Sequence, residues 1–169
     1  MYKIFDPKQT NQLLLLRRGW ISPEFELTDQ VNVYGKLSYQ WLSRRMAVAE
    51  SATDKWVFRL GMLFTRTIAI TDETGAFIGE TKREIFSRRT ILTLQSGFTA
   101  AFYRPFFFSR EHVWESPGYG TIMRTTSYPF MFKDEIIIEQ SMTPPALIPL
   151  LIFLGAHLTI LRRRRRVAR

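Results

Sequence analysis

The C-terminal segment places the strongest limit on what this chain can fold into. Residues 146–161, ALIPLLIFLGAHLTIL, are apolar around the whole circumference of a helix except at His157 and Thr159. A helix without a polar face has to be buried on every side, in protein or in lipid. The helix-breaking sequence SMTPP precedes the segment at residues 141–145, and five consecutive arginines follow it. The sequence therefore predicts one helix over residues 146–161 that needs a complete apolar surrounding.

Burial in protein is favoured over burial in lipid. At about 1.5 Å per residue this helix is roughly 24 Å long, shorter than a hydrocarbon core of about 30 Å. A membrane span would also carry five arginines across the bilayer, against the positive-inside tendency, and would place His157 in lipid. A tail-anchored membrane protein with a cytoplasmic β head nevertheless stays open as an alternative.

The rest of the chain has the pattern of short β-strands. Between about residues 13 and 140 apolar and polar residues alternate in short runs, for example around Leu37, Trp56 and Leu92. This period of two places one face of a strand on a core. Turn signals recur at strand spacing. We count ten to twelve strand candidates and no convincing helix among them, which indicates an antiparallel sandwich or barrel.

A closed barrel reconciles the two patterns, because a cylinder of strands can enclose an apolar helix and has no open edge. We therefore expect an all-β fold in which a closed antiparallel barrel of about twelve short strands surrounds the C-terminal helix. A chain of 169 residues has the size of one domain. We assign residues 1–161 to this domain, including the central helix, and residues 162–169 to a basic tail.

This layout is similar to that of the tubby C-terminal-like superfamily, which includes tubby domains, phospholipid scramblases and LURP-one-related proteins. The resemblance covers roughly residues 13–161. It rests on the order of strands and terminal helix, on the Trp56-Val57-Phe58-Arg59 strand, and on the acidic turn Asp72-Glu73-Thr74-Gly75. It implies a barrel of about twelve strands around a hydrophobic helix.

Within the superfamily, the chain is closest in size and simplicity to the LURP-one-related branch. It lacks the cysteine cluster, the acidic calcium loop and the proline-rich N-terminal extension of scramblases. The resemblance therefore does not extend to calcium-driven lipid scrambling. Tubby domains bind phosphoinositide head groups through basic barrel residues, but those positions do not align with this sequence residue by residue.

Composition and motifs argue against catalysis. The chain has no cysteine and only two histidines, so we expect no metal centre. It has no phosphate-binding or dinucleotide-binding glycine motif, and we expect no cofactor. His112 follows Glu111, but neighbours on a strand point to opposite faces, so we interpret His112 as a surface or half-buried histidine. His157 is interpreted as a core histidine whose ring bonds a barrel residue or a backbone carbonyl. The sequence predicts a protein that is not an enzyme.

The strongest candidate for a binding site is the arginine run. Residues 162–169 hold six of the 24 basic residues, and the remaining 18 basic and 15 acidic residues leave the rest of the chain at a net charge of only +3. Guanidinium groups match phosphate geometry, and a polybasic segment gains about 1 kcal/mol per cation near an anionic leaflet. The candidate anion-binding residues are Arg162, Arg163, Arg164, Arg165 and Arg166.

From these residues we expect a barrel that binds anionic phospholipid, or a membrane-proximal partner, through its basic tail. The N-terminal residues MYKIFDPKQTNQ contain no signal peptide, so the expected location is the cytoplasm, peripheral at the inner membrane face. Nucleic-acid binding through the same arginines is a second alternative, although the nearly balanced body shows no motif of that kind. A solvated tail without a specific partner is the third.

Two further groups of residues are less specific. The arginine pairs 17–18, 44–45 and 88–89, with Lys82 and Arg83, either gather into a second basic patch or lie on solvated strand edges, which is the favoured interpretation. In Phe106-Phe107-Phe108, three consecutive side chains cannot all face one side of a strand. We expect core packing at a barrel corner, with a membrane-inserting tip as the alternative.

Overall fold

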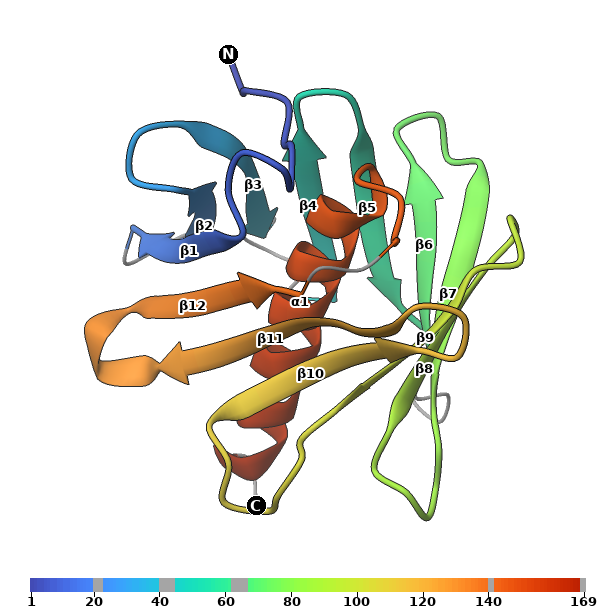
Figure 1. Ribbon diagram of the computed structural model, residues 1–169. Helices are drawn as coiled ribbons and strands as arrows, with labels where there is room; N and C mark the ends of the chain where they lie inside the picture. The colour runs from blue at the N-terminus through green and yellow to red at the C-terminus, as the bar shows by residue number, and fades with distance from the viewer. Residues whose placement is uncertain (20–22, 40–44, 62–66, 140–141, 168–169) are drawn as a thin grey trace.

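The computed structural model describes residues 1–19, 23–39, 45–61, 67–139 and 142–167. Within these residues it contains twelve β-strands, one short 3-10 turn and one α-helix (Figure 1). The elements, in chain order, are β1 Gln12–Arg18, β2 Glu24–Thr28, β3 Val33–Tyr39, β4 Met46–Ser51, β5 Lys55–Leu60, β6 Thr67–Asp72, β7 Phe77–Arg83, β8 Thr90–Leu94, β9 Thr99–Tyr103, β10 Glu111–Ser116, β11 Gly120–Tyr128, η1 Pro129–Met131, β12 Lys133–Ile138 and α1 Leu147–Val167.

The strands form one closed antiparallel barrel. Each strand pairs with the next along the chain, and β1 pairs with β12 in a register that places Leu13 opposite Ile136. Closure removes the open sheet edges that would otherwise invite pairing with another chain. The predicted closed antiparallel barrel of about twelve short strands is therefore confirmed.

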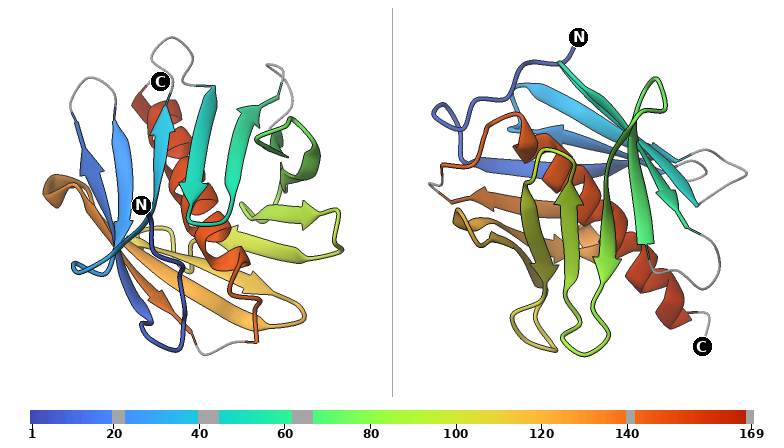
Figure 2. Two further views of the ribbon diagram at one scale, coloured as in Figure 1. Left: turned by 90° about the horizontal axis from the view of Figure 1, so that it is seen from above. Right: turned by 90° about the vertical axis from the view of Figure 1, so that its right-hand side faces the viewer.

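Helix α1 runs along the inside of the barrel, where the strands surround it (Figure 2). Leu151, Phe153 and Leu154 are fully buried, and most of the helix between Ile148 and Thr159 is buried with them. The apolar surrounding that the sequence demands is thus supplied by the protein's own strands. Among the described residues, no helix is both long enough and apolar enough to cross a membrane.

Alternating strand residues build the core around the helix. Leu37, Trp56 and Leu92, all in runs with the two-residue period, are buried. Glycine is required at position 35, where strand and helix approach closely. A methyl group on Gly35 would come within 3.0 Å of the Phe153 ring and closer still to a backbone carbonyl of β4. The barrel is therefore packed onto the helix surface, at the density usual for protein interiors.

Three polar side chains join the helix to the barrel wall. Nδ1 of His157 lies 2.9 Å from the hydroxyl of Tyr39 on β3, which confirms that this histidine bonds a barrel residue. The ring of His157 also stacks on Phe58. The indole Nε1–H of Trp114 on β10 donates to the carbonyl of Leu151, at 2.9 Å. These bonds tie the helix to strands that are far apart in the sequence.

Topology gives the barrel two distinct ends. Because neighbouring strands are antiparallel, connections from an odd to an even strand lie at one end and the remaining connections at the other. Helix α1 follows β12 and runs back through the barrel, so it ends on the same side as the odd-to-even connections. We call this side the exit end; its described connections include Arg45 and residues 84–89, 104–110 and 129–132. The opposite side is the entry end, with the turns 29–32, 52–54, 73–76, 95–98 and 117–119.

Candidate anion-binding end of the barrel

The arginine run continues the central helix instead of forming a separate tail. Helix α1 extends through Val167, beyond the end predicted at residue 161. Arginine is a good helix former, and the negative end of the helix dipole favours positive charge, so nothing in this run stops the helix. Arg164, Arg165 and Arg166 have a helical backbone, and their side chains lie outside the described part of the chain.

Arg162 is held against the inner wall of the exit end. Its Nη2 donates to Oγ1 of Thr90 on β8, at 2.9 Å, and its guanidinium lies over the ring of Phe102, 5.2 Å from the centroid. Both Arg162 and Arg163 are half-buried. The helix thus delivers two cations to the mouth of the barrel, where the hydrogen bond and the ring contact position the first of them.

His112 lies inside this mouth and is more deeply buried than the sequence indicated. The side chain is 1% exposed, its ring stacks on Phe102, and its Nε2 accepts a hydrogen bond from Nε of Arg104 at 3.0 Å. Burial, followed by the positive charges of Arg104, Arg162 and Arg163, lowers the pKa of His112 from 6.5 to about 3. The ring is therefore neutral at pH 7 and carries its proton on Nδ1.

The carboxyl next to His112 in the sequence does not take part. Glu111 lies on the outer face of β10, where Nη1 of Arg124 donates to its Oε1 at 3.0 Å. Arg124 also pairs with Glu139, again at 3.0 Å. The expectation that Glu111 and His112 point to opposite faces is thus confirmed, and the pair is not arranged for joint acid–base chemistry.

One half-buried carboxyl accompanies the cations at the mouth. Burial raises the pKa of Asp134 on β12, while Ser127, its cross-strand neighbour, and the positive charge of Arg163 act in the opposite direction. Asp134 therefore offsets part of the charge of Arg163. The helix end still brings more positive than negative charge to the mouth, since Arg162 and Arg104 also lie there.

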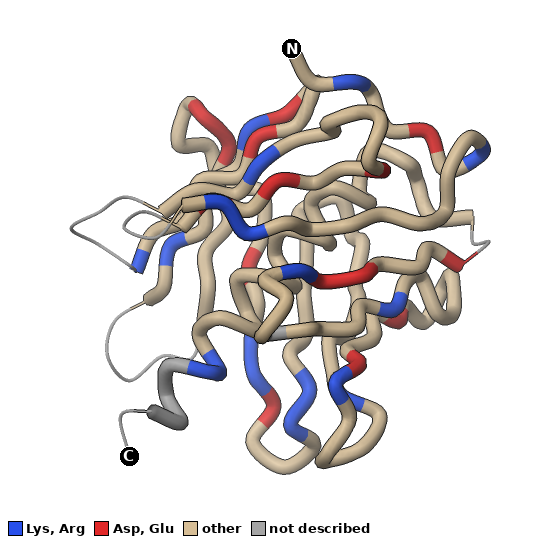
Figure 3. The backbone as a smooth tube through the Cα atoms, turned by 90° about the vertical axis from the view of Figure 1, so that its left-hand side faces the viewer, with Lys and Arg blue, Asp and Glu red and all other residues tan. Residues whose placement is uncertain are grey.

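The connections of the exit end add further cations around this mouth (Figure 3). Arg88 and Arg89 lie in the β7–β8 connection, and Arg104 and Arg110 in the β9–β10 connection. Arg45, next to β4, is exposed as well. Of the pairs considered from the sequence, Arg44 lies outside the described residues. The described arginines of these pairs thus gather with the helix terminus at one end, not as a separate second patch.

The entry end has the opposite charge. The described residues of its turns contain Asp29, Asp54 and Glu73, and they contain no lysine or arginine. Tyr34 and backbone amides of the β2–β3 turn donate to the Asp29 carboxylate and hold its pKa below its ordinary value, although burial acts against this. The exit-end connections therefore carry mainly positive charge and the described entry-end turns carry negative charge. An anionic surface attracts the exit-end connections and repels the entry-end turns.

The phenylalanine run at the exit end is exposed, and its predicted core packing is wrong. Phe106, Phe107 and Phe108 are 77%, 59% and 91% exposed. They belong to the connection between β9 and β10 and not to a strand, so the barrel core has no position for them. The guanidinium of Arg88 lies over the Phe107 ring, 5.2 Å from its centroid. This contact brings the β7–β8 and β9–β10 connections together.

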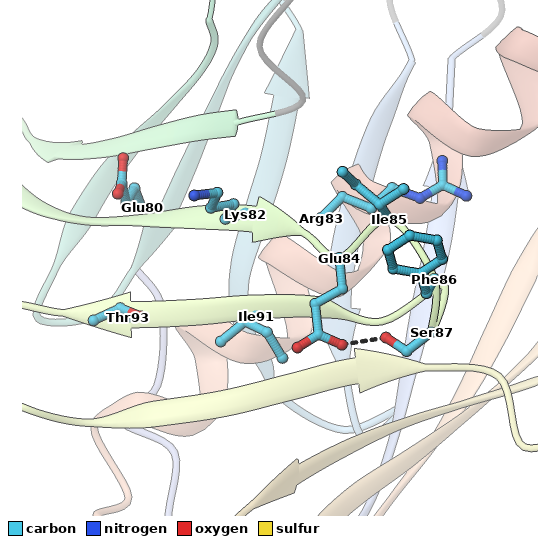
Figure 4. Close-up of a pocket in the computed structure, with 9 residues that line it drawn as sticks. All are labelled: Glu80, Lys82, Arg83, Glu84, Ile85, Phe86, Ser87, Ile91 and Thr93. Atoms are coloured by element: carbon cyan, nitrogen blue, oxygen red, sulfur yellow. Dashed lines mark hydrogen bonds between the residues drawn. The ribbon is translucent and has the colours of Figure 1, made fainter.

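An open groove of about 600 Å³ runs along the outer face of the β7–β8 hairpin (Figure 4). Ile85, Phe86 and Ile91 supply its apolar lining, and Lys82 lies farther along the same hairpin. Glu84 accepts a hydrogen bond from Ser87 at the tip. The groove shares Phe86 with the exit end, so apolar surface there extends from the loop tip onto the barrel wall.

Among the described residues, no three histidine or acidic side chains come together in a way that could hold a metal ion. Comparisons with protein-family models, with curated proteins and with solved structures find no match to this chain.

The sequence identified the arginine run, but not the surface to which it contributes. That surface depends on which connections share an end with the helix terminus, and only the order of strands in a closed barrel determines this. The sequence did contain one signal of this surface. Arginine and phenylalanine occur together both in residues 84–89 and in residues 104–110, and two strands, β8 and β9, separate these segments.

Proposed function

We propose that this protein is a non-enzymatic barrel that binds anionic phospholipid at a membrane surface through its exit end. The observation that carries the proposal is the charge division between the two ends. The helix terminus and the described exit-end connections bring arginines together, with Glu84 as the one acidic residue of those connections, whereas the charged residues in the described entry-end turns are all acidic. A negatively charged surface therefore attracts the barrel in one orientation.

The geometry of the cations suits lipid phosphate. Arg162 is positioned by Thr90 and Phe102, so less side-chain freedom is lost when it meets an anion. Guanidinium groups can donate two parallel hydrogen bonds to a phosphate group. A membrane also offers many phosphates in one plane, so it can engage several arginines of the exit end at once, which a single small anion cannot.

The barrel around a terminal helix agrees with the layout of the tubby C-terminal-like superfamily. We propose membership of that superfamily on this layout alone, with the LURP-one-related branch as the nearest in size. A cytoplasmic location, peripheral at the inner face of a membrane, follows from the proposed function and is part of the same proposal.

The proposal is tested by sedimentation with vesicles of phosphatidylcholine, alone or mixed with phosphatidylserine. We expect binding to the mixed vesicles only. The double variant Arg162→Gln/Arg163→Gln should bind roughly 30-fold more weakly, because each cation contributes about 1 kcal/mol near an anionic leaflet. The charge-conserving variant Arg162→Lys/Arg163→Lys should retain most of the binding.

A matched control removes two charges elsewhere. Lys3 and Lys8 are exposed in the N-terminal segment, which bonds through the Lys3 amide to Val33 at the entry end. Lys3→Gln/Lys8→Gln should bind like the wild type. An equal loss in both double variants would show a simple net-charge effect and contradict the proposal, as would tighter binding to duplex DNA than to the mixed vesicles at the same salt concentration.

A further inference from the structure

The exit end carries exposed aromatic side chains as well as arginines. Phe86 is 97% exposed, Phe108 91% and Phe130 93%, and each lies in a different odd-to-even connection. Large apolar side chains at this level of exposure are costly in water unless something covers them. Three neighbouring connections at one end of the barrel thus each expose a phenylalanine that does not pack into the core.

Arginines lie over two other phenylalanine rings of the same connections. The guanidinium of Arg88 lies over Phe107, 5.2 Å from the centroid, and that of Arg17 lies over Phe132 at 5.5 Å. Aromatic rings and arginines together are typical of the interface between lipid head groups and acyl chains, where the ring enters the apolar layer and the cation stays among phosphates.

The entry end also has exposed apolar side chains, but their charged neighbours in the sequence are acidic. Val31 and Met142 are 87% and 90% exposed on that side of the molecule. Their nearest charged neighbours in the sequence are Asp29 and Glu139, which an anionic surface repels. Among the described connections between strands, exposed phenylalanines and arginines coincide only at the exit end, so charge complementarity there selects an anionic lipid surface as the occupant. Lys3 and Lys8 lie at the entry end in the N-terminal segment, outside these connections.

We infer that the connections 84–89, 104–110 and 129–132 insert their phenylalanines into the interfacial layer of an anionic bilayer. This inference rests on the proposed function and deepens it. The arginines bring the barrel to the head groups, and Phe86, Phe108 and Phe130 then enter the acyl region. Since the three connections lie at the same end of the barrel as the C-terminus of α1, insertion holds the exit end against the membrane and the entry end away from it.

Insertion and electrostatic attraction respond differently to salt. At about 1 M salt the Debye length is about 3 Å, so attraction between exposed charges is largely screened, whereas burial of an apolar ring is not weakened. We therefore expect part of the binding to vesicles of phosphatidylcholine and phosphatidylserine to survive a shift to high salt after binding. Phe86→Ser/Phe108→Ser should abolish this salt-resistant part and lower binding at least tenfold. Val31→Ser/Met142→Ser, equally exposed at the entry end, should leave it unchanged.

A direct measurement uses the absence of cysteine from the chain. A single cysteine introduced as Phe108→Cys and labelled with an environment-sensitive dye should shift its emission to the blue on binding and be quenched by lipids brominated in the acyl chains. The same label at Val31→Cys should show neither change. If the protein binds at low salt but the label at position 108 stays in water, insertion is wrong and the electrostatic proposal stands. If the protein does not bind at all, both are wrong.

Discussion

The indole Nε1 of Trp114 lies 2.9 Å from the main-chain carbonyl of Leu151, so a strand of the barrel donates a hydrogen bond to the backbone of the enclosed helix. This approach is possible because Gly155 has no side chain. A methyl group at that position would lie 2.9 Å from the indole nitrogen and 3.2 Å from the Phe102 ring. The helix therefore packs directly against Trp114 and Phe102 at Gly155, with no room for a side chain.

Gly155→Ala should destabilise the protein although alanine is the better helix former. The added methyl group requires displacement of two buried rings, which costs about 1–3 kcal/mol and exceeds the roughly 1 kcal/mol gain in helix propensity. Urea unfolding measures the difference. Gly118→Ala is the control, because a methyl group there meets no atom within 4 Å. A Gly155→Ala variant more stable than the wild type would show that the wall is not closely fitted.

Tyr39→Phe should lower the free energy of unfolding by about 1–3 kcal/mol. The change removes the hydroxyl that lies 2.9 Å from His157 Nδ1 and leaves a buried ring nitrogen without that partner. Tyr119→Phe provides the comparison, because Tyr119 is 38% exposed and its hydroxyl can bond water. Equal stability of the two variants would indicate that the internal hydrogen bond contributes nothing to the enclosure of the helix.

His112 should make the protein less stable as the pH falls. The folded-state pKa of about 3 lies below the unfolded value of 6.5, so between these values the unfolded chain binds the proton and the folded chain does not. Stability is therefore full above pH 6.5 and declines below it, by about 3 kcal/mol at pH 4.5. Asp134, whose pKa is raised, acts in the opposite direction.

The variant His112→Gln isolates this effect, because glutamine can still accept the bond from Arg104 but does not titrate. Urea unfolding at pH 7.5 and pH 4.5 should show a smaller loss of stability in the variant than in the wild type. The same pH dependence in both proteins would mean that His112 titrates near its ordinary pKa in the folded state.

Gln30→Gly should stabilise the protein by about 0.5–1 kcal/mol. Gln30 has a φ of 78°, in the left-handed region, where a residue with a side chain is strained by about 1–2 kcal/mol and glycine is not. The side chain is exposed in the β2–β3 turn. The neighbouring change Val31→Gly should destabilise slightly, because it only adds freedom to the unfolded chain. Thermal unfolding of the two variants decides the order, and vesicle binding should be unaffected in both.

Much of the fold could be predicted because hydrophobic periodicity is a local property. The alternation of apolar and polar residues around Leu37, Phe58 and Leu92 indicated which face of these strands is buried. The unbroken apolar segment before Arg162 required burial on all sides. The end of the helix was less predictable. Residues 162–169 were assigned to a basic tail separate from the helix, whereas the structure continues the helix to Val167, since positive charge is favourable at a helix C-terminus.

The sequence by itself determined the buried faces, the central helix and the excess of positive charge near its end, because each depends on residues adjacent along the chain. Only the tertiary structure decided where the charges and rings collect. Arg88, Phe108 and Arg162 are separated by many residues, and they lie at one end because an antiparallel closed barrel alternates its connections and the helix returns through it. The same closure leaves Phe106, Phe107 and Phe108 in a connection instead of in the core, which no local pattern could show.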